Sequence, residues 1–119
     1  MISIGDHCRI NNNCTIVSEG GGIEIGPYCL VGTNVEIYDS DFHALDPVKR
    51  RTGDAQSIFP VRIGVNVFIG SNVRILKGVN IGDNSVIANS AVVVDSIPPN
   101  VIAGGNPARI LNPLQNNQS

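Results

Sequence analysis

The chain has 119 residues, 15% of them charged and 4% aromatic, and its formal net charge is -2. That length suggests one domain, and the weakly acidic balance with few aromatic side chains excludes a basic nucleic-acid footprint and a base-stacking platform. No apolar run approaches the ~20 residues of a membrane span and no basic leader opens the chain, so we expect a cytoplasmic protein without nucleic-acid or membrane partners.

Isoleucine and valine dominate the composition. The chain holds 16 Ile, 14 Val and only 5 Leu, beside 14 Asn and 13 Gly. Branched side chains favour strands, whereas Asn and Gly supply tight turns, including turns with positive φ. These counts predict many short strands joined by many turns, and they exclude a helical bundle. The cysteines Cys8, Cys14 and Cys29 match no zinc spacing, and we interpret them as small, buried or half-buried thiols.

A period of six residues runs along most of the chain. Ile or Val stands at every sixth position from Ile63 to Val93, and shorter runs with the same spacing begin at Ile4 and Ile25. The period fits a strand of about four residues followed by a two-residue corner, and three such sides close a triangular coil of about 18 residues. We expect the first and fifth residues of each unit to point inward, with Gly, Asn and Asp at the corners.

The period places four coils, at residues 4–21, 23–42, 63–80 and 81–98. Residues 18–22 (Ser-Glu-Gly-Gly-Gly) interrupt it and are interpreted as a short corner extension. Residues 38–60 form a second interruption, one long extruded loop, and a loop of this length in a compact domain is usually functional. After residue 94 the repeat ends, which suggests a repeat domain at 1–111 and a polar tail at 112–119.

The long loop contains one of the two histidines. His43 lies within it, and neutral imidazole near pH 7 suits a general base. His7 falls at a corner and is interpreted as a surface residue. Asp39, Asp41 and Asp46 are all candidates to orient the imidazole of His43, and the spacing does not choose among them. Two histidines cannot supply a three-histidine zinc site, so no metal is expected.

Three further segments stand out. Residues 40–47 read Ser-Asp-Phe-His-Ala-Leu-Asp-Pro, residues 67–70 read Val-Phe-Ile-Gly, and Ile-Pro-Pro-Asn at 97–100 precedes Gly-Gly-Asn-Pro-Ala-Arg at 104–109. Together they resemble the histidine loop, the Val-Trp-Ile-Gly motif and the closing motif of hexapeptide-repeat sugar O-acetyltransferases of the maltose and galactoside acetyltransferase type. The resemblance covers residues 4–112. It implies an all-β, left-handed parallel β-helix, a hand that the spacing alone does not fix.

The resemblance also implies an activity and an assembly. The chain is expected to be a CoA-dependent O-acetyltransferase that moves an acetyl group from acetyl-CoA to a hydroxyl of a sugar or polysaccharide precursor. A homotrimer with active sites between its subunits is expected as well. His43 is then the general base, and Asn11, or as second choice Asn13, binds the acceptor hydroxyl. The residues that match the donor groove are Phe68, Ser71, Asn89, Val94 and Arg109.

Two positions depart from that family's pattern. Asn89 stands where the family prefers Gly or Ala, and Val94-Asp95 stand where it has a Thr-Lys pair. The change removes a cation that would contact the CoA phosphates, unless Lys77 or Lys49 substitutes for it. These departures keep open the alternative of a non-catalytic β-helix scaffold. A second enzymatic alternative, an N-acetyltransferase of an amino sugar or nucleotide-linked amino sugar, also stays open.

Arg50 and Arg51 belong to the same long loop. They are interpreted either as a solvated run of charge or as contacts to a charged acceptor. The acceptor itself is not identified by any of these motifs.

Overall fold

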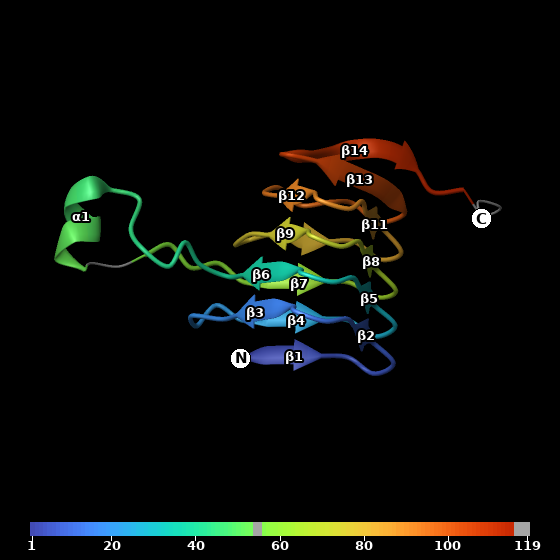
Figure 1. The fold of residues 1–119 in the computed structure, drawn as a ribbon, viewed down its shortest axis with the longest axis horizontal. Coiled ribbons are helices and arrows are strands. Elements are labelled where there is room, and N and C mark those ends of the chain that lie inside the picture. The colour runs from blue at the N-terminus through green and yellow to red at the C-terminus, as the bar shows by residue number, and fades with distance from the viewer. Residues whose placement is uncertain (54–55, 116–119) are drawn as a thin grey trace.

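A triangular prism of stacked coils forms the body of the molecule (Figure 1). The structure, a computed structural model, describes residues 1–53 and 56–115. The strands of the first face are β1 (Ile2–Ile4), β4 (Ile23–Ile25), β7 (Val61–Ile63) and β10 (Asn80–Ile81). The second face contains β2 (Arg9–Ile10), β5 (Leu30–Val31), β8 (Phe68–Ile69) and β11 (Val86–Ile87). The third face contains β3 (Thr15–Val17), β6 (Glu36–Tyr38), β9 (Arg74–Ile75) and β12 (Val92–Val93).

The stacked strands on each face pair in parallel and in register. Ile4, Ile25, Ile63 and Ile81, for example, follow one another up the first face. The predicted all-β, left-handed parallel β-helix of four triangular coils is therefore confirmed. The predicted coils were counted from isoleucines such as Ile4 and Ile63. On the first face these isoleucines are the last residues of their strands, so most coils begin one or two residues earlier than predicted.

The inside of the prism is filled as the period predicts. First-position Ile69 and Ile75 and fifth-position Val67 and Val73 are all 0% exposed. The first coil differs, since Ile4 is 47% exposed whereas its equivalent in the second coil is 2% exposed. Among the described residues no further coil lies beneath the first one, so its inward side chains are left partly uncovered.

The corners explain why the chain is rich in asparagine. The fourth residue of nearly every unit has a φ near +60°, in the left-handed region that L side chains other than Asn, Asp and Gly rarely adopt. These residues are His7, Asn13, Tyr28, Asn34, Asn66, Asn72, Asn84, Ser90 and Asn100. At the corner between the first and second faces, Asn66 donates to Asn84 at 3.1 Å, and Asn84 donates to Asn100 at 2.9 Å. His7 occupies the same corner, and its ring stacks on Tyr28 with 4.9 Å between centroids.

The second residue of a unit is glycine because the next coil passes very close. A Cβ atom on Gly26 would lie 2.4 Å from the carbonyl oxygen of Gly64. The small fifth position accounts for the cysteines. Cys29 is fully buried and Cys8 is half-buried, and each Sγ donates to a backbone carbonyl of the next coil at 3.2 Å. Burial raises the pKa of the Cys29 thiol, which favours an inert packing role.

A hairpin covers the C-terminal end of the prism. Strand β13 (Val101–Gly105) pairs in parallel with β11, and β14 (Ala108–Pro113) returns antiparallel across it. β14 continues two residues beyond residue 111, so the domain boundary suggested there stays a prediction, and residues 116–119 of the suggested tail lie outside the described residues. Within the described chain, no helix is long and apolar enough to cross a membrane.

Candidate active site

The long loop leaves the prism at the corner between the third and first faces, where β6 ends and β7 begins (Figure 1). Its two arms run antiparallel at the base. Phe59 N donates to Asp39 O at 2.9 Å, and Ser40 and Ile58 form a bridge. The predicted loop therefore starts as a paired stem, and the stem carries the rest of the loop well away from the coils.

Asp39 anchors this stem. Its side chain is fully buried and accepts hydrogen bonds from Ser18 Oγ at 2.6 Å, Glu19 N at 2.7 Å and Gly22 N at 2.8 Å. Burial alone would raise the pKa of Asp39, but these hydrogen bonds together outweigh it and hold the pKa below its ordinary value. The carboxylate thus ties the 18–22 corner extension to the loop, and it is engaged away from the imidazole of His43.

A short helix that the sequence analysis did not predict lies at the tip of the loop. Helix α1 (Pro47–Thr52) begins after Asp46, whose carboxylate accepts from two backbone N–H groups of the first turn at 2.9 and 3.0 Å. It ends at Gly53, which has a φ of 80°. The signals were present, because an acidic N-cap, a proline at the first position and a C-terminal glycine are typical of helix ends. No residue of α1 is buried.

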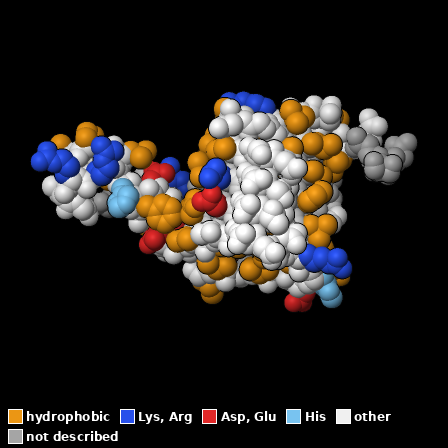
Figure 2. Space-filling model, in the orientation of Figure 1, with side chains coloured by type: hydrophobic (Ala, Val, Ile, Leu, Met, Phe, Trp, Pro, Cys, Tyr) orange, Lys and Arg blue, Asp and Glu red, His pale blue; other side chains and the backbone are white. Residues whose placement is uncertain are grey.

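His43 lies in a hollow between the loop arms and α1. The hollow has a volume of about 310 Å³ and is lined by Phe42, His43, Ala44, Arg50, Gly53, Gln56 and Ile58. The imidazole itself is exposed. Figure 2 shows Lys and Arg side chains gathered on the protruding loop beside a histidine. The structure therefore places the predicted base where a small molecule can reach it.

Of the three aspartates near His43, Asp41 is the one with a buried side-chain oxygen that lacks a hydrogen-bond partner in the described residues. Its Oδ1 forms an ion pair with Lys77 Nζ at 3.1 Å, whereas its Oδ2 is buried and has no hydrogen-bond partner. The carbonyl oxygen of Gln56, on the opposite arm, is also buried and unpartnered. In the described residues, then, the loop leaves two acceptors unsatisfied, and Lys77 is already engaged by a carboxylate.

Three of the predicted residues share the corner between the second and third faces. Ser71 N donates to Asn89 Oδ1 at 2.8 Å, and Thr33 N donates to Ser71 Oγ at 3.1 Å. In the first coil, Asn11 Nδ2 donates to Val31 O at 3.2 Å. Ser71 and Asn89 thus satisfy backbone N–H groups at a turn, whereas Val31 O already accepts from Asn11 N at 3.0 Å. Asn89, which departs from the family pattern, thus has a structural partner.

Val94 and Arg109 lie instead at the corner between the third and first faces. Val94 follows β12 and is 40% exposed. Arg109 Nη1 donates to Ala108 O at 3.0 Å and lies 3.9 Å from Asp95 Oδ2. The aspartate that stands in place of a lysine therefore does more than remove a cation, because it also offsets part of the charge of Arg109. Both side chains are largely exposed, so the pair is worth little in stability.

Phe68 belongs to an apolar column on the second face. It is 49% exposed and lies in register between Leu30 below and Val86 above, with Ile102 next in the same column. The Phe68 ring therefore lies on the outside of the prism, and its predicted place in a donor groove stays a prediction. The ring flanks the corner that carries Ser71.

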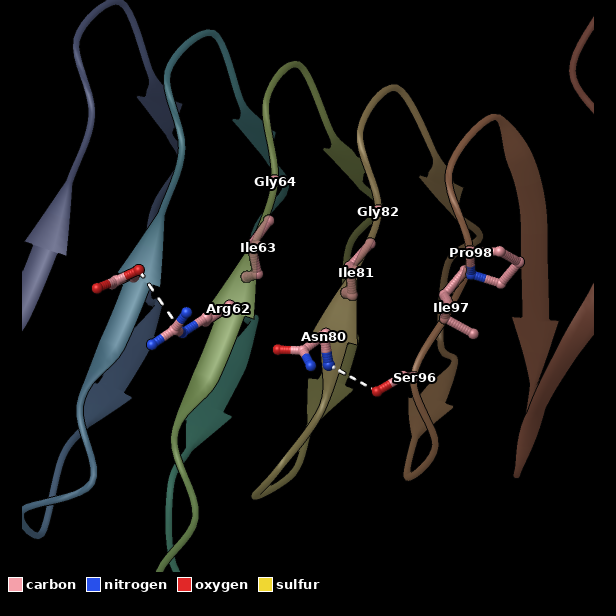
Figure 3. Close-up of a pocket in the computed structure, with 10 residues that line it drawn as sticks. Arg62, Ile63, Gly64, Asn80, Ile81, Gly82, Ser96, Ile97 and Pro98 are labelled. Atoms are coloured by element: carbon pink, nitrogen blue, oxygen red, sulfur yellow. Dashed lines mark hydrogen bonds and ion pairs between the residues drawn. The ribbon is translucent and has the colours of Figure 1, made fainter.

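A second hollow, of about 750 Å³, lies on the first face, and none of the predicted residues lines it. Figure 3 shows its polar row, in which Arg62, Asn80 and Ser96 project from successive coils. Arg62 pairs with Glu24 at 3.8 Å, and Asn80 N donates to Ser96 Oγ at 2.9 Å. Arg62 and Ser96 of this row thus already have partners on neighbouring coils.

The predicted residues therefore form two groups within one chain. Asn11, Ser71 and Asn89 share one corner, His43 and the pair Val94 and Arg109 belong to the next corner, and the third face separates the groups. Residues 1–53 and 56–115 contain no cluster of side chains that could hold a metal ion.

Comparisons with known proteins identify relatives of the whole prism. The sequence matches the family described as the hexapeptide repeat of succinyl-transferase over residues 1–39 and 60–94. Galactoside O-acetyltransferase of Escherichia coli K12 is 42% identical over 113 residues, which are 95% of this chain and 54% of that protein.

Two solved structures agree closely with the fold. A hexapeptide-repeat acetyltransferase from Vibrio cholerae, complexed with acetyl-CoA, has a TM-score of 0.88 at 41% identity and covers 97% of this chain and 61% of that one. A galactoside acetyltransferase in complex with coenzyme A has a TM-score of 0.89 at 39% identity and covers 96% of this chain and 56% of that one. The chain thus spans about half to three fifths of the length of these relatives.

Proposed function

This chain belongs to the hexapeptide-repeat family of transferases, and on that premise we propose that it transfers the acetyl group of acetyl-CoA to a hydroxyl of a sugar or polysaccharide precursor. The observation that carries the proposal is the position of His43. It is the histidine of the extruded loop, it is exposed, and it lines a hollow beside a prism that matches an acetyl-CoA complex at 41% identity.

The chemistry requires a base because a sugar hydroxyl is a poor nucleophile until its proton is removed. His43 takes that proton as the hydroxyl oxygen attacks the thioester carbonyl, forming a C–O bond and a tetrahedral oxyanion. The C–S bond then breaks, and the imidazolium returns its proton to the departing CoA thiolate. Asn11 assists by binding the acceptor hydroxyl. One Nδ2 proton is donated to the carbonyl oxygen of Val31, and the second is available to donate to the acceptor hydroxyl oxygen, whose own proton is left for His43.

The separation of the two groups supports a site built from two subunits. His43 and Arg109 of one copy face the same corner region, whereas Asn11 and Ser71 lie across the third face. A homotrimer brings these unlike corners of neighbouring copies together around a threefold axis. The donor then lies along the groove between copies, with Phe68, Ser71, Asn89 and Val94 on its walls and Arg109 at the CoA phosphates.

The extruded loop gives independent support for this assembly. Helix α1 has no buried residue. Its Val48 is 68% exposed, and Leu45 just before the helix is 71% exposed. Apolar side chains on a protruding arm favour contact with another copy. The apolar column on the second face offers a surface of the same kind. A cytoplasmic location is part of the proposal, because the donor is made there and the three cysteines are unpaired.

One observation favours a second candidate, the non-catalytic scaffold. Asp95 lies 3.9 Å from Arg109 and repels the phosphates that Arg109 would bind. If that repulsion dominates, the prism keeps its fold but loses its donor. Calorimetric titration with CoA separates the two candidates, since a scaffold gives no binding heat at millimolar CoA and an enzyme saturates.

The decisive experiment measures CoA thiol release with a panel of sugar hydroxyls and amino sugars. A positioned base contributes about 10²–10⁴-fold, so His43→Ala should lower kcat by about that factor while CoA still binds. His7→Ala is the matched control, because His7 stacks on Tyr28 at a corner remote from the loop. A His43→Ala enzyme that keeps more than about a tenth of the wild-type kcat would show that another group is the base. If only the amino groups of the amino sugars are acetylated, the protein is an N-acetyltransferase and the proposed O-transfer is wrong.

A further inference from the structure

The hollow that contains the base also contains a cation. Arg50 of α1 and His43 of the preceding turn line the same 310 Å³ space. We propose that the acceptor is an acidic sugar, such as a uronic acid unit, whose carboxylate binds Arg50 while its hydroxyl meets His43. This inference rests on the proposed function and names the substrate class of the same site.

Among the described residues around the hollow, positive charge exceeds free negative charge. Lys49, Arg50 and Arg51 all lie in the last turn of α1, and none of them forms an ion pair within the described residues. Three described carboxylates are close in sequence, and each is held by a partner. Asp39 accepts hydrogen bonds from the 18–22 segment. Asp46 caps the opposite end of the helix, and Asp41 is paired with Lys77. An anion entering the hollow therefore meets cationic charge with no described carboxylate free to compete.

The rest of the lining suits a sugar ring. Phe42, Ala44 and Ile58 give the hollow an apolar side against which the C–H face of a pyranose can pack, and Gln56 adds an amide. The ring of Phe42 is held edge-to-face against Tyr38 with 4.9 Å between centroids. A volume of about 310 Å³ is at the small end of the range for ligand sites, which favours a single sugar unit over a long oligosaccharide.

Arg50 is better placed for the acceptor than for the donor. The phosphates of CoA are assigned to Arg109 in β14, whereas Arg50 shares its hollow with the base. A guanidinium binds a carboxylate through two parallel hydrogen bonds, so it fixes the orientation of the ring as well as attracting its charge. Both properties help to present one particular hydroxyl to His43.

The test compares matched acceptors that differ only in the carboxylate. Methyl glycosides of glucuronic, galacturonic and mannuronic acid are assayed beside the methyl glycosides of glucose, galactose and mannose. The wild type should prefer at least one acid over its neutral partner by about 10- to 100-fold in kcat/KM, as expected for a hydrogen bond to a charged group. Arg50→Gln should reduce that ratio to about 1, and 0.5 M salt should reduce it in the wild type.

Arg51→Gln is the control, because it removes a cation from the same helix turn but from a residue that does not line the hollow. It should keep most of the preference. A wild type that acetylates neutral glycosides as well as acids overturns the inference and leaves the proposed function standing. A rise in the KM for acetyl-CoA in Arg50→Gln, with the acid preference intact, assigns Arg50 to the donor and also overturns it. No acetylation of any glycoside, with CoA bound, overturns the proposed function itself.

Discussion

Replacing Asp39 by asparagine tests whether one buried carboxylate fastens the catalytic loop to the prism. Asn has the same shape, so the substitution leaves the packing unchanged. It alters only the hydrogen-bonding pattern, because an N–H₂ group replaces one carboxylate oxygen. In the wild-type protein the two carboxylate oxygens of Asp39 accept hydrogen bonds from Ser18 Oγ, Glu19 N and Gly22 N, at 2.6 to 2.8 Å.

The magnitude follows from those three hydrogen bonds. In the variant at least one backbone N–H faces another donor, and a buried donor without a partner costs about 1–3 kcal/mol. The bonds that survive lose their charge assistance, which makes each about half as strong. Because the side chain is fully buried, solvent screening does not reduce these effects. We expect Asp39→Asn to lower the free energy of unfolding by about 2–4 kcal/mol at pH 7.

The pH dependence gives a second, independent readout. The folded-state pKa of Asp39 is lowered, so its contribution to stability is present above about pH 4, the ordinary aspartate range, and is lost as pH falls through the folded pKa. Urea unfolding followed by circular dichroism should therefore show the gap between wild type and variant closing on acidification.

Asp46→Asn is the matched control for this series. Asn is as good an N-cap as Asp, so it should change stability by less than about 0.5 kcal/mol. A loss below about 0.5 kcal/mol in Asp39→Asn, or a gap that does not change with pH, would refute the anchoring role.

Three further predictions concern the prism and the donor. Gly26→Ala places a Cβ 2.4 Å from a carbonyl oxygen of the next coil, so the melting temperature should fall by about 8 °C or more. An unchanged melting curve would contradict the close packing of the coils. Ile69→Ala should cost about 2–5 kcal/mol and Ile10→Ala under about 1 kcal/mol, because the first side chain is 0% and the second 37% exposed; equal urea midpoints would contradict this. Arg109→Ala should raise the KM for acetyl-CoA and Asp95→Asn should lower it; steady-state kinetics with no change in either would place the donor elsewhere.

The repeat made most of the fold predictable. A six-residue period determines which side chains point inward, and Ile69 and Val73 are buried as that period requires. The asparagines were correctly assigned to corners because the fourth position needs a positive φ, as Asn66 and Asn84 show. The period does not encode what packs against the outer side of the first coil. Ile4 has the same place in the period as Ile25, yet the first side chain is 47% exposed and the second 2%.

The candidate site was less predictable because it lies where the period breaks. The six residues of α1 are too few to show a helical hydrophobic period, and only the capping residues Asp46 and Gly53 indicate the helix. The role of Asp39 arises from contacts about 20 residues away in sequence, which no local motif contains. The pairing of Asp95 with Arg109 likewise joins two corner segments that meet only in the folded chain.

The central claim is that one active site takes residues from two copies of the chain, and subunit mixing tests it most directly. His43→Ala and Asn11→Ala are each expected to be nearly inactive. When the two variants are unfolded and refolded together in equal amounts, random assembly gives about a quarter of all the shared sites both intact side chains. We predict that acetyl transfer recovers to about that fraction of the wild-type rate. A mixture no more active than the separate variants would contradict the account.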